Sequence, residues 1–395
     1  MFQLTEQELK EGYGGYTAKE INQQPKVWLE AFANFEENRK RYQDFIQSIL
    51  KKHTQVKVLL AGAGTSAFAG DVTAYVLQRQ YQGAVQFEAA ATTDIVSNPE
   101  NYLFKEVPTI LVSFARSGNS PESVAAVELG EQIVKDFYQV VITCNKEGEL
   151  AKRTENDANS LSILTPDDAH DQGFAMTSSY TSMMLLCYEL FSLKPTSKQR
   201  LELLAKCAEN VLGRVTPTVE EILEIPMDRI VYLGSGLLQH VAHEASLKML
   251  ELTSGEVAAV YESSLGFRHG PKSILNDQSA VVVFLSEDPY TRKYDLDIVR
   301  ELAAEDSQLK LIVIGERYDK AVEELADWSL FVNHTESVIQ NDFYNSLLYI
   351  ILPQVLALKK SAQLGVTPDN PSPSGSLNRV VQGVTIYDYS GDGEK

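Results

Sequence analysis

The sequence contains few cysteines, few positive charges and no long apolar run, and each shortage excludes a class of protein. Its three cysteines, Cys144, Cys187 and Cys207, are far apart and form no C-x-x-C pair, so neither a disulfide framework nor a zinc site is predicted. We expect buried free thiols. The 35 lysines and arginines against 54 aspartates and glutamates give a net charge of −19, which argues against general binding to nucleic acid or to an anionic membrane.

The N-terminus, MFQLTEQELKEGYGG, is polar and acidic, whereas a signal peptide begins with basic and then apolar residues. No uninterrupted apolar run reaches about 18 residues, the length at which a transmembrane helix is predicted. We therefore expect a cytoplasmic protein with no nucleic-acid or membrane partner. At 395 residues the chain exceeds the size at which one core stops growing, so two domains are expected.

Short β-rich runs alternate with helical segments along both halves of the chain. In the first half the runs are VKVLLAG, AVQFEAA, TILVSF, YQVVITC and SLSILT. From Arg200 the rhythm starts again, with RIVYLGS, AVVVFLS, LKLIVIG and SLFVNH and then the helical stretch NDFYNSLLYIILPQVLALKKSAQLG. This alternation predicts parallel sheets covered by helices, and the paired turns LLAGAGTS and VYLGSGLL indicate two copies of one plan.

We therefore expect an α/β protein with two doubly wound, flavodoxin-like parallel-sheet domains in tandem. Residues 1–40 form an N-terminal helical lead-in, and apolar residues at helical spacing continue from Pro25 to Lys52. The first domain takes residues 41–199 and the second takes 200–365. The tail, residues 366–395, is rich in proline, serine and asparagine, which predicts an extended C-terminal arm.

Two strand-to-helix turns in the first half could hold a phosphate. In an open parallel sheet, ligands bind beyond the carboxyl ends of the strands, where N–H groups at helix N-termini attract anions. The turn AGAGTSAFAGD offers Gly62 and Gly64 for close approach of the backbone. Thr65 and Ser66 follow as hydroxyl donors.

The second turn is SFARSGNSPES, which follows the apolar run TILV. Gly118 suits a positive φ, Ser120 can cap the following helix, and Pro121 fits its first turn. The residues expected to converge on one anion are Arg116, Ser117, Gly118, Asn119 and Ser120.

A structural role or a different ligand is also open for these turns. Both could be helix caps and nothing more, since Ser-Pro-Glu at a helix start needs no ligand. The first could bind a dinucleotide, because the stretch from Gly62 to Ala67 matches G-x-G-x-x-A and Glu88 ends a candidate second strand about 24 residues on. The hydroxyl-rich second turn favours a compact phosphate monoester instead.

In the second half, Glu244, Lys248 and Glu251 stand at positions i, i+4 and i+7, so they share one face of a helix. Alone, such a pattern is typical of a solvated, salt-bridged surface, and His269 could be an ordinary loop histidine. A carboxylate that moves a proton between adjacent sugar carbons, together with a histidine that opens the ring, is what aldose–ketose isomerisation requires. The helix face and His269 together therefore indicate this chemistry, although neither would indicate it alone.

Together these residues resemble the tandem sugar isomerase (SIS) domain family, which includes the isomerase half of glucosamine-6-phosphate synthase. The resemblance covers nearly the whole chain. Its motifs are Gly-Thr-Ser at Gly64 to Ser66, Ser117-Gly118 with Ser120, Glu-x-x-x-Lys-x-x-Glu at Glu244, Lys248 and Glu251, and His-Gly-Pro at His269 to Pro271. The stretches DQGFAMTSSYTSM, SLGFRHGPKS and NRVVQGVTIY look most like the subgroup of galactosamine-6-phosphate deaminase/isomerases, formerly called tagatose-6-phosphate ketose/aldose isomerases.

The resemblance implies a role for each motif. The first two hold the sugar phosphate, Glu251 moves the proton between C1 and C2, and His269 opens the ring. Lys248 and Glu244 assist proton transfer. In the family the histidine reaches the site from the neighbouring subunit, so the resemblance implies a homodimer, or a tetramer, that shares its active site. No metal and no other cofactor is expected.

The chain departs from the family in two places. In the second turn, Ala115 and Arg116 replace a serine and a glutamine, and the arginine would add a charge-assisted contact to the phosphate. Gln382 stands where the synthase carries a lysine near its C-terminus, so imine formation by that lysine is not carried over.

We expect release of ammonia rather than amination, because no glutaminase domain precedes the first domain to supply ammonia. The expected reaction converts D-galactosamine 6-phosphate to D-tagatose 6-phosphate and ammonia. Two alternatives stay open: a plain ketose/aldose isomerase or deglycase, and a sugar-phosphate-sensing SIS module. The second is less favoured, because the acidic N-terminal region shows no basic recognition helix.

Overall fold

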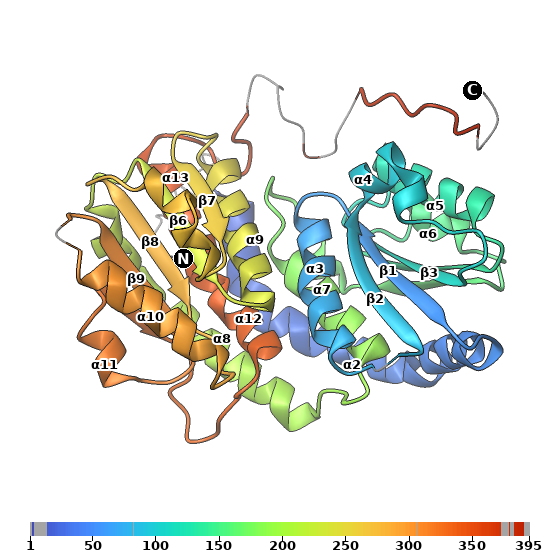
Figure 1. Cartoon of the computed structure of the whole chain (residues 1–395), viewed down its shortest axis with the longest axis horizontal. Coiled ribbons are helices and arrows are strands. Elements are labelled where there is room, and N and C mark those ends of the chain that lie inside the picture. Colours follow the sequence, from blue (N-terminus) through green and yellow to red (C-terminus); the bar gives the residue numbers. More distant parts are fainter. Residues whose placement is uncertain are drawn as a thin grey trace. The chain divides into compact units, whose positions relative to one another are not determined.

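The computed structural model describes residues 2–3, 14–81, 83–305, 307–372, 379 and 383–390. The chain divides into two compact units, each built on a five-stranded parallel sheet (Figure 1). The first-sheet unit contains residues 31–170, 182–195 and 374–395, and the second-sheet unit contains residues 1–30, 171–181 and 196–373. The predicted α/β class with two parallel sheets is confirmed.

The first sheet has the strand order β2-β1-β3-β4-β5. Its strands are β1 (Val56–Gly62), β2 (Val85–Ala91), β3 (Thr109–Ala115), β4 (Phe137–Thr143) and β5 (Ser160–Leu164). Every residue of β1 and β3 is buried, whereas β2 at the edge alternates between buried and exposed residues. Central strands of a parallel sheet are covered on both faces, which explains why their sequences are almost entirely apolar.

Helices connect these strands and lie on both faces of the sheet (Figure 1). Right-handed crossovers place the helix between β1 and β2 on one face and the helix between β3 and β4 on the other. The helices of this part of the chain are α3 (Thr65–Gln78), α4 (Thr92–Ser97), η1 (Pro99–Asn101), α5 (Pro121–Ile133), α6 (Glu149–Arg153), η2 (Asp167–Ala169) and α7 (Ser178–Phe191).

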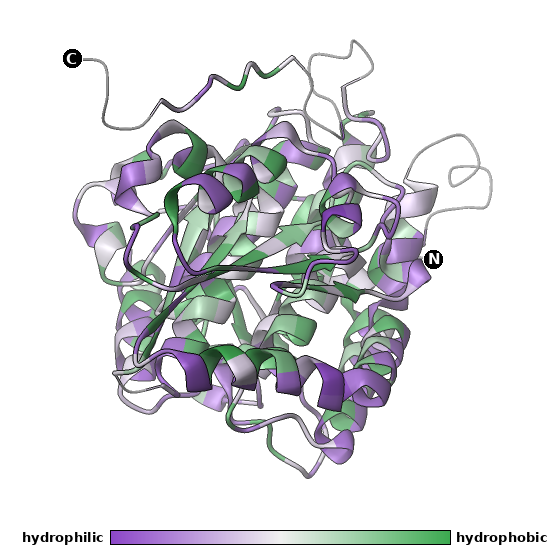
Figure 2. Ribbon diagram, turned by 90° about the vertical axis from the view of Figure 1, so that its right-hand side faces the viewer, coloured by the Kyte–Doolittle hydropathy of each residue, from purple (hydrophilic) through white to green (hydrophobic). Residues whose placement is uncertain are grey.

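The second sheet repeats the plan, with the order β10-β9-β8-β6-β7. Its strands are β6 (Arg229–Gly234), β7 (Ala258–Glu262), β8 (Ser279–Phe284), β9 (Lys310–Gly315) and β10 (Trp328–Phe331). Its helices are α8 (Lys198–Leu223), α9 (Leu237–Leu252), η3 (Gly266–Arg268), η4 (Pro271–Ile274), α10 (Thr291–Ala303), α11 (Lys320–Glu323), α12 (Asp342–Tyr349) and α13 (Ile351–Gln363). Figure 2 shows the hydrophobic colour along the strands and the hydrophilic colour on the outward faces of the helices.

Two features of the second-sheet unit differ from the expectations. Strand β7, which pairs with β6 at the edge, was not predicted, because its five residues are mostly half-buried and give no apolar run. The long C-terminal helix is broken into α12 and α13 at Ile350. Pro353 follows the break, and proline lacks the N–H that would bond to the carbonyl of Tyr349.

The N-terminal helical stretch is a single helix, α2 (Gly15–Lys52), although Pro25 lies inside it. Proline removes the N–H that would bond to the carbonyl four residues earlier, which belongs to Ile21. The Gln24 side chain replaces it, because its Nε2 donates to the Ile21 carbonyl at 3.1 Å. The helix therefore continues through the proline.

The Glu20 carboxyl ties α2 to the segment of residues 171–181 within the second-sheet unit, and the Asp171 carboxylate holds that segment in shape. Glu20 accepts hydrogen bonds from the N–H groups of Gln172 and Gly173. Asp171 accepts from the N–H groups of Thr177, Ser178 and Ser179 at the start of α7. The packing needs a glycine at residue 173, since a Cβ there would lie 2.7 Å from Thr17 Oγ1. This segment from the middle of the chain is therefore bound to the unit that carries the second sheet.

The three cysteines are free thiols, as predicted, with Cys187 and Cys207 buried and Cys144 half-buried. Among the described helices, none is both long enough and apolar enough to cross a membrane.

The Glu20 carboxyl gives the fold a pH dependence. Burial raises the pKa of Glu20 to about 8, and the neighbouring Asp171 adds to the rise. Between the ordinary glutamate pKa and this value, the folded state holds a proton that the unfolded state has lost. The free energy of unfolding should therefore fall as the pH rises toward 8, by up to about 1.4 kcal/mol per pH unit.

In Glu20→Gln the side chain is neutral at every pH and its amide oxygen still accepts from Gln172 and Gly173. We expect this variant to lose the fall in stability between pH 6 and pH 8.5. Urea unfolding at a series of pH values measures it, with Glu30→Gln, an exposed position of α2, as the control. Parallel pH curves for wild type and Glu20→Gln would contradict the assignment.

Candidate active site

The crevice of the first sheet lies between β1 and β3, which are neighbours although their crossovers leave in opposite directions. In doubly wound sheets this switch point is where ligands bind, beyond the carboxyl ends of the strands. Both predicted phosphate turns are there, since one follows β1 and the other follows β3.

The first turn is shaped by two glycines. Gly64 has φ 55° and ψ −130°, a conformation that favours glycine. Gly62 has no room for a side chain, because a Cβ would lie 2.5 Å from the Ser66 backbone. The Thr65 and Ser66 hydroxyls consequently stand on the first turn of α3, and both residues are buried.

The second turn carries the arginine. Arg116 directly follows the buried strand β3 and is itself buried. Gly118 has φ +70°, and a Cβ there would lie 3.3 Å from the Cα of Gly148. Ser120 occupies the N-cap position of α5, but its side chain accepts no capping hydrogen bond, contrary to the expectation. A hydroxyl that does not cap its own helix favours a ligand over a purely capping role.

Two asparagines brace this second turn. The Oδ1 of Asn119 accepts from the Glu149 N–H at 2.9 Å, so its side chain contacts the start of α6. Asn145 Nδ2 donates to the Ser117 carbonyl at 2.8 Å. A direct contact of Asn119 with phosphate stays a prediction. Asn145 was missed in the sequence, because only the pairing of β3 with β4 brings it beside Ser117.

The dinucleotide alternative is not supported by the position of Glu88. This glutamate lies inside β2, which continues to Ala91, so it does not end the strand as expected. Its carboxylate pairs with Lys57 Nζ at 2.7 Å. A ribose-binding acid belongs at the carboxyl end of the second strand.

The corresponding turns of the second sheet have the same backbone but other side chains. Gly236 has φ 62° and ψ −130°, almost the values of Gly64. The two residues that follow Gly236 are Leu237 and Leu238, where the first turn has Thr65 and Ser66. The helix that follows Gly236, α9, therefore begins without hydroxyl donors.

Strand register aligns the remaining positions. In the first sheet Ala61 pairs with Ser113, and in the second sheet Leu233 pairs with Val283. Counting onward from these pairs aligns Arg116 with Ser286, and Ala125 of α5 with Asp295 of α10.

The Asp295 carboxylate fills the second crevice. It is fully buried and accepts from Ser235 Oγ at 2.5 Å, Ser264 Oγ at 2.6 Å and the Ser286 N–H at 3.0 Å. Burial raises its pKa, although the hydrogen bonds from the two serines oppose the rise. A protein anion thus takes the place that is equivalent to the predicted phosphate site, so the first sheet is the better candidate for an external anion.

The predicted catalytic face of α9 is buried, which corrects the alternative of a solvated surface. Glu244 and Lys248 are fully buried, and the Glu251 side chain is 23% exposed. Lys248 Nζ lies 2.5 Å from Glu251 Oε2 and 3.3 Å from Glu244 Oε1. Burial alone would lower the pKa of Lys248, but the two carboxylates outweigh it and raise that pKa.

His269 directly follows the short helix η3 and is exposed. Its backbone N–H bonds to the Gly266 carbonyl at 2.9 Å. Among the described residues, none forms a hydrogen bond with its ring. The predicted phosphate residues belong to the first-sheet unit, and the predicted catalytic residues belong to the second-sheet unit.

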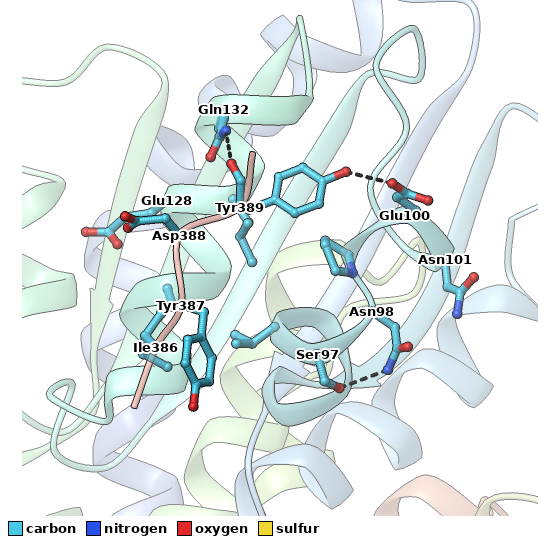
Figure 3. Close-up of a pocket in the computed structure, with 14 residues that line it drawn as sticks. Ser97, Asn98, Glu100, Asn101, Glu128, Gln132, Ile386, Tyr387, Asp388 and Tyr389 are labelled. Atoms are coloured by element: carbon cyan, nitrogen blue, oxygen red, sulfur yellow. Dashed lines mark hydrogen bonds between the residues drawn. The ribbon is translucent and has the colours of Figure 1, made fainter. Parts of the chain in front are cut away.

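A cavity of about 690 Å³ lies elsewhere in the first-sheet unit, beside α4, η1 and α5 (Figure 3). The C-terminal segment from Ile386 to Tyr389 forms one of its walls. This segment is fastened by Gln132 Nε2, which donates to the Tyr389 carbonyl at 2.7 Å, and by the Tyr389 hydroxyl, which donates to Glu100 at 2.9 Å (Figure 3). The carboxylates of Glu100, Glu128 and Asp388 line the cavity, so it does not suit a phosphate.

The C-terminal arm also meets the second turn, because Arg116 Nη2 donates to the Arg379 carbonyl at 3.0 Å. Gln382 lies outside the described residues. In the described ranges, no group of three or more His, Cys, Asp or Glu side chains could hold a metal ion. That the reaction needs no metal stays a prediction.

Comparison with known families identifies the fold. The SIS domain model matches residues 51–193 and 225–359. The chain belongs to the SIS domain family. The matched ranges lie inside the domain extents that we propose from the sequence, 41–199 and 200–365.

Named relatives extend over almost the whole chain. The D-galactosamine-6-phosphate deaminase AgaS of Shewanella sp. (strain ANA-3) is 44% identical over 95% of this chain and 93% of its own length. The protein of the same name from Escherichia coli is 42% identical over 95% of this chain and 96% of its own. The crystal structure of tagatose-6-phosphate ketose/aldose isomerase from Escherichia coli has a TM-score of 0.87 at 38% identity and covers 95% of this chain and 97% of that one.

The buried Lys248 should be important for stability. Lys248→Met removes the cation that neutralises the buried Glu244, so we expect the free energy of unfolding to fall by about 3 kcal/mol. Urea denaturation measures the loss. The double variant Glu244→Gln with Lys248→Met buries no charge at these two positions and should regain most of the stability. A double variant as unstable as Lys248→Met would show that charge pairing is not the cause.

Proposed function

We propose that the protein is an amino-sugar-phosphate deaminase/isomerase that converts D-galactosamine 6-phosphate to D-tagatose 6-phosphate and ammonia. The named relatives at 42–44% identity support the substrate class. The observation that carries the chemistry is the buried Lys248 with its two carboxylates on α9. A buried charge cluster of this kind costs desolvation energy, so its presence favours a chemical role.

In this proposal the turns after β1 and β3 hold the phosphate. Thr65, Ser66, Ser117 and Ser120 supply hydroxyl donors, and Arg116 supplies the positive charge. Gly64 and Gly118 give the backbone its positive φ at each turn. A chain with a net charge of −19 can still bind an anion, because local donors set the field inside a pocket.

The chemistry begins with ring opening by His269, which exposes the C1 aldehyde. Glu251 then takes the proton from C2 and returns it to C1, while the aldehyde oxygen gains a proton and the amine nitrogen loses one, so the C1 aldehyde becomes an alcohol and the C2 amine becomes an imine. Water adds to the C2 imine, and ammonia leaves as the ketone forms. Lys248 and Glu244 assist the proton transfers, since Lys248 contacts both carboxylates.

We further propose an assembly of two or four copies in which His269 acts in the site of a neighbouring subunit. Its ring is exposed, and no described residue of its own chain holds it by a hydrogen bond. An imidazole in that position is available to a second copy.

Glu251→Gln should abolish turnover, because an amide cannot accept the C2 proton, while binding of substrate stays close to normal. Ammonia release from D-galactosamine 6-phosphate measures the rate, and calorimetric titration measures binding. Glu256→Gln, an exposed position just beyond α9, is the matched control. Ammonia release near the wild-type rate in Glu251→Gln would refute the role of the base.

Arg116→Ala should raise KM about tenfold or more with little change in kcat, because the phosphate contact exists in both the ground state and the transition state. Ser117→Ala should act in the same direction with a smaller effect. Arg153→Ala is the control, since this arginine of the same unit pairs with Glu128 and Glu149. A loss confined to kcat would contradict the phosphate role.

The relative that is named an isomerase supports a second candidate, plain ketose/aldose isomerisation of a sugar phosphate. The two reactions share ring opening and proton transfer and differ in the group on C2. Assays with amino sugar 6-phosphates and with the corresponding aldose 6-phosphates separate them. Isomerisation without ammonia release from any amino sugar would select the isomerase.

A further inference from the structure

The loop that carries His269 is held at both ends by one acidic residue. Glu301 on α10 pairs with Arg268, which precedes His269, and with Lys272, which follows the His269-Gly-Pro tip. Arg268 Nε lies 2.6 Å from Glu301 Oε2, and Lys272 Nζ lies 2.5 Å from Glu301 Oε1. Each carboxylate oxygen therefore takes one of the two cations.

The tip between these cations has little other support. His269, Gly270 and Pro271 are all exposed. Gly270 has φ +121°, and a Cβ there would meet nothing within 4 Å. On the N-terminal side the fully buried Phe267 fixes the chain, whereas Lys272 begins the C-terminal side, where the residues of η4 are half-buried or exposed. The link through Glu301 therefore holds the C-terminal side of the loop, which burial does not fix.

The other contacts in the cluster each hold only one end of the tip. Lys272 also pairs with Glu305, which lies just beyond the C-terminal end of α10, whereas the carboxylate that Arg268 pairs with is Glu301. Arg268 Nη1 donates to the Ser264 carbonyl at 3.3 Å, within its own loop. Hydrogen bonds from Lys272 and Arg268 hold the pKa of Glu301 below its usual range, so its carboxylate is ionised at neutral pH.

We propose that Glu301 is a positioning residue for His269. It fixes the distance between Arg268 and Lys272 and thereby the direction in which the three-residue tip presents the imidazole. This inference rests on the proposed ring-opening role of His269. Because a misplacement of about 1 Å in a catalytic group can cost about a hundredfold in rate, a carboxylate that touches no substrate can still control turnover.

The test is a double-mutant cycle with Glu301→Gln, His269→Asn and the double variant. In the wild-type background, Glu301→Gln should lower kcat about tenfold with KM changed less than about twofold, because the phosphate contacts are elsewhere. In the His269→Asn background the same change should have no further effect, since the histidine through which Glu301 acts is already gone. Glu301→Asp, which keeps the charge, should recover part of the rate.

Glu305→Gln is the matched control, because it removes the same charge from the same part of the chain but leaves the link between Arg268 and Lys272 in place. Its kcat should stay within about twofold of wild type. Thermal unfolding of each variant separates loss of fold from loss of position. If Glu301→Gln fails to fold, Lys272→Met tests the same link from the other end and should show the same dependence on His269.

The outcomes are distinguishable. If the effects of Glu301→Gln and His269→Asn on kcat multiply, Glu301 does not act through His269 and the inference is wrong, while the proposed function stands. If Glu305→Gln is as slow as Glu301→Gln, lost charge rather than the link is the cause, and the inference is again wrong. If His269→Asn turns over like wild type, the proposed ring-opening role fails and the inference fails with it.

Discussion

The strand order of each parallel sheet is the constraint on which the rest of the structure depends. In both sheets the first strand of the unit lies between later ones, and the chain leaves it first to one side and then to the other. No crossover can cover the carboxyl ends of the two central strands, so a crevice flanked by helix N-termini remains there. Glycine with positive φ is needed at that turn, and Gly64 and Gly236 adopt nearly the same conformation. The two halves therefore offer two equivalent positions.

The two positions have diverged in their side chains. The first has hydroxyls and an arginine, which suit an external anion. The second has leucines at the start of its helix and the Asp295 carboxylate inside the crevice. The helices that follow the two turns, α3 and α9, differ in the opposite way: the charged residues are on the helix of the second sheet. Counted from Gly64 and Gly236, Val72 and Val76 of α3 correspond to Glu244 and Lys248 of α9. One copy has thus placed its polar groups in the turn, and the other has placed them along the helix.

Burying the charged face of α9 costs the fold desolvation free energy. A fully buried lysine between two carboxylates gives up hydration that its salt bridges only partly restore, and an apolar stripe such as that of α3 would cost less. Charged residues at buried positions go against the pattern that the fold alone would favour, and such exceptions are typical of functional sites. The buried carboxyl groups of Glu20 and Asp171 are a second such place: Glu20 binds α2 to the N–H groups of Gln172 and Gly173, and Asp171 binds N–H groups at the start of α7.

The sequence by itself determined the sheets and the candidate residues. Apolar runs such as VKVLLAG and TILVSF are buried on both faces, so they are visible without a partner, and helical spacing placed Glu244, Lys248 and Glu251 on one face. It did not determine β7, whose half-buried edge carries no continuous apolar signal, or the break before α13. Tertiary structure alone decided that the α9 face is buried, that Asp295 fills the second crevice and that Glu301 joins the two ends of the His269 loop. Each of these depends on residues far apart in the chain, and contacts of that kind leave no local pattern.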